Sequence, residues 1–147
     1  MRDVAEDLRA TVEAAAPRLL VIGEAESGAR PAPGKWSQKE ILGHLIDSAT
    51  NNHQRFVRAQ LSGELTFPGY EQEGWVSVQQ YQGVPWEGLV TLWRSYNLHL
   101  AHLIGTVSGE RLATRCVINE RDPVTLEFLM RDYVAHLKNH LGQIGAR

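Results

Sequence analysis

The chain has 147 residues, of which 43% are hydrophobic, with a formal net charge of −2 and a pI near 6.3. This length and composition predict one globular domain over residues 1–147, with its own hydrophobic core. The charge balance argues against a nucleic-acid partner, because proteins that bind nucleic acid are typically strongly basic. No apolar run approaches the ~18 residues of a membrane-spanning helix, and the first residues lack a signal-peptide pattern, so we expect a cytoplasmic protein with no membrane partner.

The chain contains a single cysteine, Cys116, which excludes a disulfide within the chain. A lone thiol can act as a nucleophile when a histidine lies beside it. No histidine is close to Cys116 in the sequence. We therefore expect a buried, unreactive thiol.

The first half of the chain contains two segments with the three- and four-residue spacing of apolar side chains that is typical of amphipathic helices. The first segment covers residues 2–26, and Pro17 is expected to kink it or to split it in two. The second begins at Ser37, which forms a capping-box pattern with Glu40, and ends near Leu61. These two segments are the first two predicted helices.

The second half contains two more amphipathic segments, over residues 86–107 and from Thr125 towards the C-terminus. Between the second and third helices, residues 65–85 form a long irregular connection in which a short helix is expected near Trp75. Residues 115–118 are compatible with an extended conformation. Four amphipathic helices in a chain of this length predict an all-α protein, a four-helix bundle.

Three histidines on two of these helices are candidates for a metal site. His136 and His140 are four residues apart, so a helix places both side chains on one face, one turn apart. His44 lies in the apolar-periodic part of the second helix. Facing helices of a bundle can bring such side chains together around one ion. The alternative is that all three are ordinary packed or half-buried helix residues.

The other histidines fit a site less well. His53 is about half a helical rotation away from His44 and is expected at the surface. His99 and His102 lie at the margin of the apolar stripe of the third helix, where a polar edge residue is the more common role.

Three imidazoles suit zinc, nickel, copper or iron and leave at least one coordination position open, where a water would have a pKa near 7. Leu137 follows His136, so the general base that zinc proteases carry beside their first histidine is absent. Asp47, Glu40 or Tyr133 could carry protons or orient an imidazole. On position alone, Asp47 ranks first among them.

Four segments, taken together and in order, resemble the DinB/YfiT-like superfamily. They are Lys35-Trp-Ser-Gln-Lys-Glu-Ile-Leu-Gly-His-Leu-Ile-Asp-Ser48, Asn51-Asn-His-Gln-Arg-Phe56, Pro68-Gly-Tyr-Glu-Gln-Glu-Gly-Trp-Val76 and Asp132-Tyr-Val-Ala-His-Leu-Lys-Asn-His-Leu-Gly-Gln-Ile144. The resemblance covers roughly residue 30 to the end.

The resemblance implies a four-helix bundle with a long crossover between helices 2 and 3, often assembled as a homodimer. It also implies a divalent metal ion, nickel or zinc, bound by one histidine of the second helix and two of the fourth. Those positions correspond to His44, His136 and His140 in this sequence.

The implied activity is less specific than the implied fold. The resemblance is compatible with a metal-dependent hydrolase or with a transferase that uses a low-molecular-weight thiol as cofactor, in each case acting on a small molecule. The alternative is a non-enzymatic metal-binding or stress-related protein in which the ion has a structural role.

Overall fold

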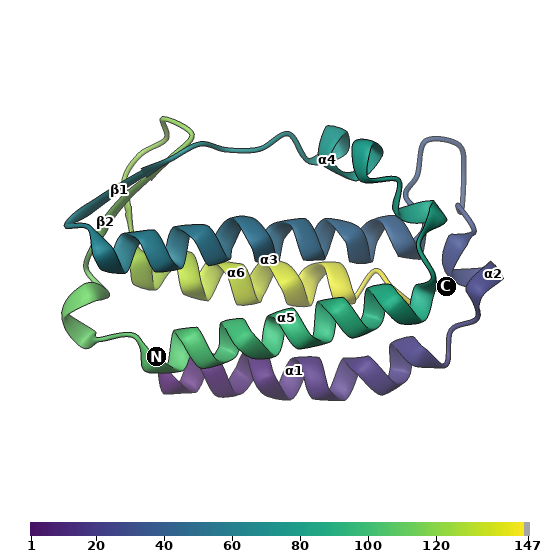
Figure 1. Ribbon diagram of the computed structural model, residues 1–147, viewed down its shortest axis with the longest axis horizontal. Helices are drawn as coiled ribbons and strands as arrows, with labels where there is room; N and C mark the ends of the chain where they lie inside the picture. Colours follow the sequence, from purple (N-terminus) through teal and green to yellow (C-terminus); the bar gives the residue numbers. More distant parts are fainter. Residues whose placement is uncertain (146–147) are drawn as a thin grey trace.

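The computed structural model of the chain describes residues 1–145, and four long helices form its main body (Figure 1). They are α1 (Arg2–Leu20), α3 (Gln38–Leu61), α5 (Trp86–Thr106) and α6 (Leu126–Leu141). Helix α5 packs against α1 and α3, and α6 packs against the same two helices from the other side. The predicted four-helix bundle is therefore confirmed.

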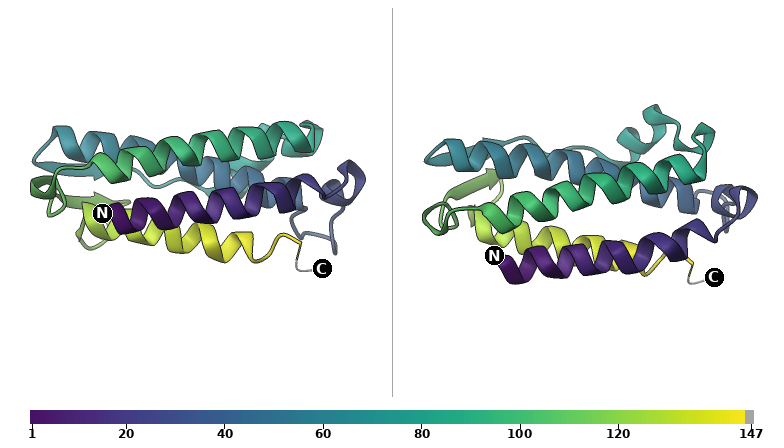
Figure 2. Two further views of the ribbon diagram at one scale, coloured as in Figure 1. Left: turned by 90° about the horizontal axis from the view of Figure 1, so that it is seen from below. Right: turned by 60° about the horizontal axis from the view of Figure 1, so that its bottom comes forward.

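A long crossover joins α3 to α5, as the resemblance implied. It contains the strand β1 (Glu64–Phe67), the short helix α4 (Gln72–Gln79) and a 3-10 turn, η1 (Tyr81–Gly83). Figure 1 shows that this segment runs back along the length of the bundle, so α3 and α5 point in the same direction. Figure 2 shows from two further sides that α1 and α6 lie next to each other. The expected short helix near Trp75 is α4.

Three short strands close one end of the bundle. Strand β1 pairs in parallel with β2 (Arg115–Ile118), and β2 pairs with β3 (Val124–Thr125) in the antiparallel direction. The extended conformation of 115–118 agrees with the sequence analysis, whereas β1 was not predicted. Its pairing partner lies about fifty residues away, and local sequence patterns carry no information about such long-range pairs.

The first predicted helix is split, but not at Pro17. Helix α1 continues through Pro17 to Leu20, and a separate short helix, α2, covers Glu24–Gly28. The interruption lies at residues 21–23, where Gly23 adopts an extended conformation before the new helix begins. Pro17 removes one hydrogen bond from the last turn of α1, and the remaining bonds and the burial of Leu19 hold that turn.

The buried hydrophobic side chains form one cluster to which all four long helices contribute. Trp93 and Phe56 are its largest fully buried members. Cys116, which is fully buried in β2, belongs to the same cluster and confirms the expected buried thiol. None of the helices in the described part of the chain is both long enough and apolar enough to cross a membrane.

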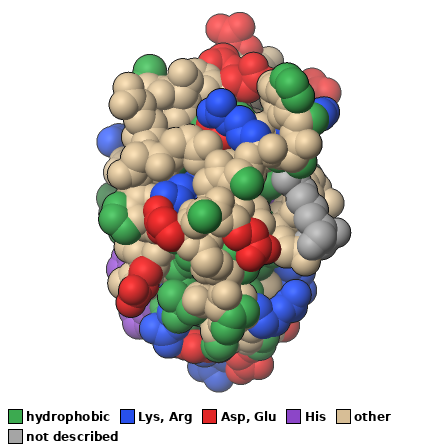
Figure 3. Space-filling view, turned by 90° about the vertical axis from the view of Figure 1, so that its right-hand side faces the viewer, with side chains coloured by type: hydrophobic (Ala, Val, Ile, Leu, Met, Phe, Trp, Pro, Cys, Tyr) green, Lys and Arg blue, Asp and Glu red, His purple; other side chains and the backbone are tan. Residues whose placement is uncertain are grey.

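The surface at the end of the bundle near α2 carries charges of both signs. Figure 3 shows that acidic and basic side chains are interspersed on this face and that neither forms a separate charged patch. Among the ion pairs of the described residues, Arg94–Glu13 and Lys138–Asp7 join helices α1, α5 and α6 at exposed positions. Exposed pairs of this kind each contribute about 1 kcal/mol or less to stability.

Gly43 allows the crossover to approach α3 closely. The Tyr81 ring lies directly against the backbone of α3 at this residue, and a Cβ atom on Gly43 would come within 2.1 Å of the ring. Tyr81 is buried, with 6% of its surface exposed. A glycine in the middle of α3 is therefore needed for packing, although glycine is a poor helix former.

We expect Gly43→Ala to lower the free energy of unfolding by about 1–3 kcal/mol, because the new methyl group must displace Tyr81. Gly88→Ala in α5 is the matched control, since a Cβ atom there meets nothing within 4 Å. Helix propensity alone should make this control neutral or stabilising by up to about 1 kcal/mol. Urea denaturation of both variants measures the difference, and an equally stable Gly43→Ala protein would contradict the packing argument.

Candidate metal centre

The start of α3 is fixed by the capping box that the sequence predicted. The Ser37 hydroxyl accepts the backbone N–H of Glu40 (3.2 Å), and the Glu40 carboxylate accepts the backbone N–H of Ser37 (2.8 Å). Arg30 donates two further hydrogen bonds to Glu40, and these hold the pKa of Glu40 below its usual range. Oε2 of Glu40 accepts hydrogen bonds from the cap and from Arg30, and Oε1 accepts one from Arg30, which leaves this carboxylate poorly suited to carry protons.

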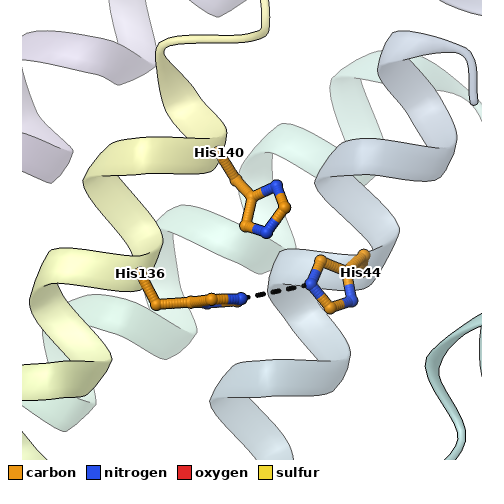
Figure 4. A group of neighbouring side chains, drawn as sticks. All are labelled: His44, His136 and His140. Carbon is orange, nitrogen blue, oxygen red and sulfur yellow. Dashed lines mark hydrogen bonds between the residues drawn. The ribbon is translucent and has the colours of Figure 1, made fainter.

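Helix α6 runs antiparallel to α3 and presents its two histidines to it (Figures 1 and 4). Thr125 caps α6 by accepting the backbone N–H of Phe128 (3.1 Å). His136 and His140 then lie one turn apart, and their rings approach that of His44 with centroids 5.3 and 4.8 Å away. The structure therefore brings together all three histidines that the sequence analysis proposed as ligands.

The spacing of the three imidazoles fits one ion. The Nε2 atoms of His44 and His136 are 3.4 Å apart, and one ring nitrogen from each of the three residues lies within 4.8 Å of the others. Nitrogens bound tetrahedrally at zinc–nitrogen distances of 2.0–2.1 Å are separated by roughly 3.3 Å. A small movement of the His140 ring towards the other two rings would bring all three nitrogens to the separation that one ion requires.

The Nδ1 atoms of the three histidines differ in their hydrogen-bond partners. His140 Nδ1 is hydrogen-bonded to Gln143 Oε1 at 3.1 Å, so the amide can select the tautomer whose Nε2 is free to coordinate. The other nitrogen of His140 faces the two remaining rings in Figure 4. The Nδ1 atoms of His44 and His136 are buried and have no partner among the described residues.

Burial keeps the site neutral and therefore suited to a cation. His44 is fully buried, and its pKa falls to about 4 because burial disfavours the charged imidazolium, with smaller contributions from His140 and His136. Burial also lowers the pKa of His136. Neutral imidazole is the form that binds metal ions. The ring of Trp36 packs on His44 with centroids 5.3 Å apart.

Asp47 lies on α3 one turn after His44 and faces the crossover. Its Oδ1 accepts hydrogen bonds from the Tyr81 hydroxyl and from Gln79 Nε2, both at 2.6 Å. Its Oδ2 is buried without a partner among the described residues. Burial raises the pKa of the Asp47 carboxyl, and the two hydrogen bonds to Oδ1 lower it by a smaller amount. Asp47 thus fastens the end of the crossover to α3.

Tyr133 lies on α6 one turn before His136. It is fully enclosed, and its hydroxyl donates a hydrogen bond to Asn97 of α5. Burial raises the pKa of the Tyr133 phenol, so it keeps its proton at neutral pH.

The other histidines do not join the group. His53 points away from His44, as predicted, but it is partly buried against α5 and not a plain surface residue. Its Nδ1 lies 2.7 Å from the Tyr96 hydroxyl and its ring is 5.2 Å from that of His99. His99 and His102 are exposed.

A pocket of about 500 Å³ opens beside His136, between α3, α6 and two connections at residues 69–72 and 118–124. Polar and charged residues line it. They include Ser48, Asn52 and Arg55 of α3, Arg121 and Asp122 of the connection before α6, and Asp132 of α6. This pocket was not predicted from the sequence. The segments Asn51–Phe56 and Pro68–Val76 were signals of it, since they form part of the resemblance without contributing a ligand.

Comparison with known proteins gives a consistent result. The sequence model of the DinB superfamily matches residues 4–144. A candidate metal-dependent hydrolase of Oceanobacillus iheyensis is 23% identical over 111 residues, which is 76% of this chain. The matched region spans only 64% of that protein's length.

A solved structure shares the fold. YfiT from Bacillus subtilis, described as a candidate metal-dependent hydrolase with an unusual four-helix bundle topology, superposes with a TM-score of 0.79. The superposition covers 97% of this chain and 81% of YfiT at 20% sequence identity. At this identity the likeness concerns the fold.

The pKa of His44 predicts a pH dependence in the metal-free protein. Unfolded His44 binds a proton below about pH 6.5, whereas folded His44 does so only near pH 4. The unfolded state therefore binds more protons in this window, and stability should fall as the pH drops through it, by about 3 kcal/mol in all.

Chemical denaturation between pH 7 and 4 tests this expectation in the presence of a chelator. His44→Gln should show a smaller loss of stability with falling pH than the wild-type chain. The exposed His102 provides the control, and His102→Gln should follow the wild-type slope. Equal slopes for wild type and His44→Gln would contradict the assignment.

Proposed function

Because the chain belongs to the DinB superfamily, we propose that it is a divalent-metal-dependent enzyme whose ion is bound by His44, His136 and His140. One observation carries this proposal: the histidine group adjoins a pocket of about 500 Å³ through His136. Three ligands leave a coordination position free, and the pocket gives a small molecule access to it. A closed structural site would need neither the vacancy nor the pocket.

The donor set agrees with zinc or nickel, both of which accept imidazole ligands. When bound, such an ion supplies Lewis acidity, which polarises a carbonyl oxygen and makes coordinated water more acidic. The protein's own residues hold this ion in place. Gln143 orients His140, and Trp36 covers His44 on one side.

Asp47 remains our candidate for proton transfer, ahead of Tyr133. The buried Oδ2 of Asp47 has no partner among the described residues and burial raises the pKa of this carboxyl, so it is better suited to transfer a proton than Tyr133, whose proton is directed to Asn97. Asp47→Asn should lower the rate of a detected reaction by roughly 10²–10⁴-fold, and Tyr133→Phe by much less. A larger effect of Tyr133→Phe would reverse this assignment.

Hydrolysis is the reaction class we favour, because the relative in Oceanobacillus iheyensis and YfiT are both described as candidate metal-dependent hydrolases. Transfer of a group to a low-molecular-weight thiol is the second variant of the same proposal. Titrating the cobalt-loaded protein with glutathione and cysteine distinguishes them, since a thiol that coordinates cobalt produces a sulfur-to-metal charge-transfer band. The absence of a band with either thiol would count against the transferase variant.

A structural role for the ion is the competing function. The three ligands come from α3 and α6, which are far apart in the sequence, so an ion would cross-link two helices of the bundle. In that case the bound ion should mainly add folding stability, because the affinity of the folded state for the metal adds to the free energy of unfolding.

Zinc binding to His140→Ala tests the site. We expect the wild-type chain to bind one zinc ion and His140→Ala to lose most of its affinity, because the remaining two imidazoles form a much weaker site. Isothermal titration calorimetry on tag-free protein measures the loss. His102→Ala on the exposed side of α5 should bind zinc like the wild type.

The melting temperature of the same variants separates the two roles. A largely preformed enzyme site predicts that the wild-type chain remains folded and melts cooperatively after zinc is removed. If the wild-type chain unfolded on removal of zinc, the structural role would be favoured. If His140→Ala bound zinc as tightly as the wild type, the three-histidine site itself would be wrong.

A further inference from the structure

Arg55 is a buried cation for which the described part of the chain provides no anion. It lies on α3, three turns beyond His44, and only 9% of its surface is exposed. Within residues 1–145 no carboxylate forms an ion pair with it and no side chain or backbone atom accepts a hydrogen bond from it. Its Nε atom is buried without a partner, and its guanidinium lies over the ring of Phe67, 5.7 Å from the centroid.

This arrangement is costly for folding unless something else binds the guanidinium. Burial of a charge without a counter-charge is among the least favourable contributions to stability, and here burial lowers the pKa of the Arg55 guanidinium. The contact with Phe67 compensates only in part, because a cation over an aromatic ring leaves the N–H groups unbonded. A ligand that accepts those N–H groups would offset the cost.

Arg55 lines the same pocket as His136. The other charged residues of this pocket are Arg121, Asp122 and Asp132, and all three are exposed. Water therefore screens their charges, and neither aspartate forms an ion pair with Arg55. Tyr70 also lines the pocket. Burial raises the pKa of the Tyr70 phenol, and the positive charge of the nearby Arg55 partly offsets this increase.

We propose that the pocket binds a small organic molecule through its carboxylate, with the carboxylate on Arg55 and the opposite end of the molecule near His136. A planar guanidinium and a carboxylate match in geometry, since two parallel N–H groups can donate to the two oxygens. Arg55 is the buried cation of this pocket, and one negative charge matches it, which favours a monocarboxylate over a phosphate dianion.

The spacing of His44 and Arg55 along α3 indicates an extended ligand. Eleven residues separate His44 from Arg55, which corresponds to roughly 16 Å along the helix axis. Long side chains of a helix point back towards its N-terminus, so the guanidinium lies nearer to the histidines than its Cα atom does. The gap suits a carboxylate separated from the reacting group by several bonds. The reaction at the opposite end of the ligand rests on the proposed function. The binding of its carboxylate to Arg55 does not.

Hexanoate and hexanamide are matched probes, because they have the same length and differ in charge. Their dissociation constants can be measured by titration of a two-dimensional 15N NMR spectrum of the full-length, metal-free protein. We expect wild type to bind hexanoate at least 10-fold more tightly than hexanamide, with shifts in the backbone signals of residues 52–56 and 67–70. Arg55→Met should remove most of this preference and leave hexanamide binding unchanged.

Two other arginines provide the controls. Arg58→Met removes the same charge from an exposed position on α3, outside the pocket, and should change hexanoate affinity by less than about 2-fold. Arg121→Met removes the exposed cation of the pocket and should have a much smaller effect than Arg55→Met. A loss with Arg121→Met that equals or exceeds the loss with Arg55→Met would overturn the assignment to Arg55.

Stability measurements distinguish a ligand-binding role from a structural one. If the role of Arg55 is to bind a ligand, Arg55→Met should melt at the same temperature as the ligand-free wild type or higher. The substitution replaces an unpaired buried charge by an apolar side chain of similar length. A markedly lower melting temperature would indicate a structural role and overturn the proposal. Should Arg55→Met fail to fold, Arg55→Lys keeps the charge but loses the paired N–H groups, and hexanoate affinity should still fall several-fold.

The use of metal-free protein separates this proposal from the proposed function. Hexanoate could also coordinate a bound ion, so only the metal-free titration isolates Arg55. Equal affinities of the wild-type chain for hexanoate and hexanamide would refute the carboxylate site, whatever the outcome for zinc. Selective binding of hexanoate by a chain that does not bind zinc would support the carboxylate site and refute the metal-dependent function alone.

Discussion

The contact between the antiparallel helices α3 and α6 determines the geometry on which the candidate site depends. Each residue of an α-helix adds a rotation of 100° and a rise of 1.5 Å, so a shift of one residue would carry both histidines of α6 away from His44. The caps at Ser37 and Thr125 fix where the two helices begin. The bond between Tyr133 and Asn97 ties α6 to α5 in addition. The ligand set is therefore a property of the whole bundle and not of a local motif.

The crossover depends on a second buried contact, centred on Asp47. Its carboxylate accepts hydrogen bonds from Tyr81 and Gln79, and Gly43 gives the Tyr81 ring room to lie against α3. A buried carboxylate is costly, and the two donors compensate only its Oδ1. The arrangement places an incompletely satisfied acid one helical turn from a histidine, which is common where a fold serves chemistry as well as stability.

The helices and the three histidines could be predicted because their signals are local. Apolar periodicity, the Ser37 cap and the four-residue spacing of His136 and His140 are all contained within short segments. The pocket was not predicted, because two of its walls, residues 69–72 and 118–124, follow strands that pair across about fifty positions of the sequence. The importance of Arg55 was hidden for the same reason: on the helix it resembles a surface arginine, and Phe67, which lies against it, belongs to the crossover. Glu40 was considered as a proton carrier from its position, but Arg30 and the helix cap occupy it.

The pairing of β1 with β2 has a further consequence for how such a protein can diversify. It joins the start of the crossover to the connection before α6, so Phe67 pairs with Ile118. The rim segments that follow these two residues, 69–72 and 119–124, line the pocket. The imidazoles are held by the rigid helices, whereas these rim segments are connections, which tolerate substitution and changes in length far better than helix interiors do. Changes in these rim segments would thus alter the shape of the pocket while the three histidines stay in place. A single bundle could in this way be adapted to many substrates without being rebuilt.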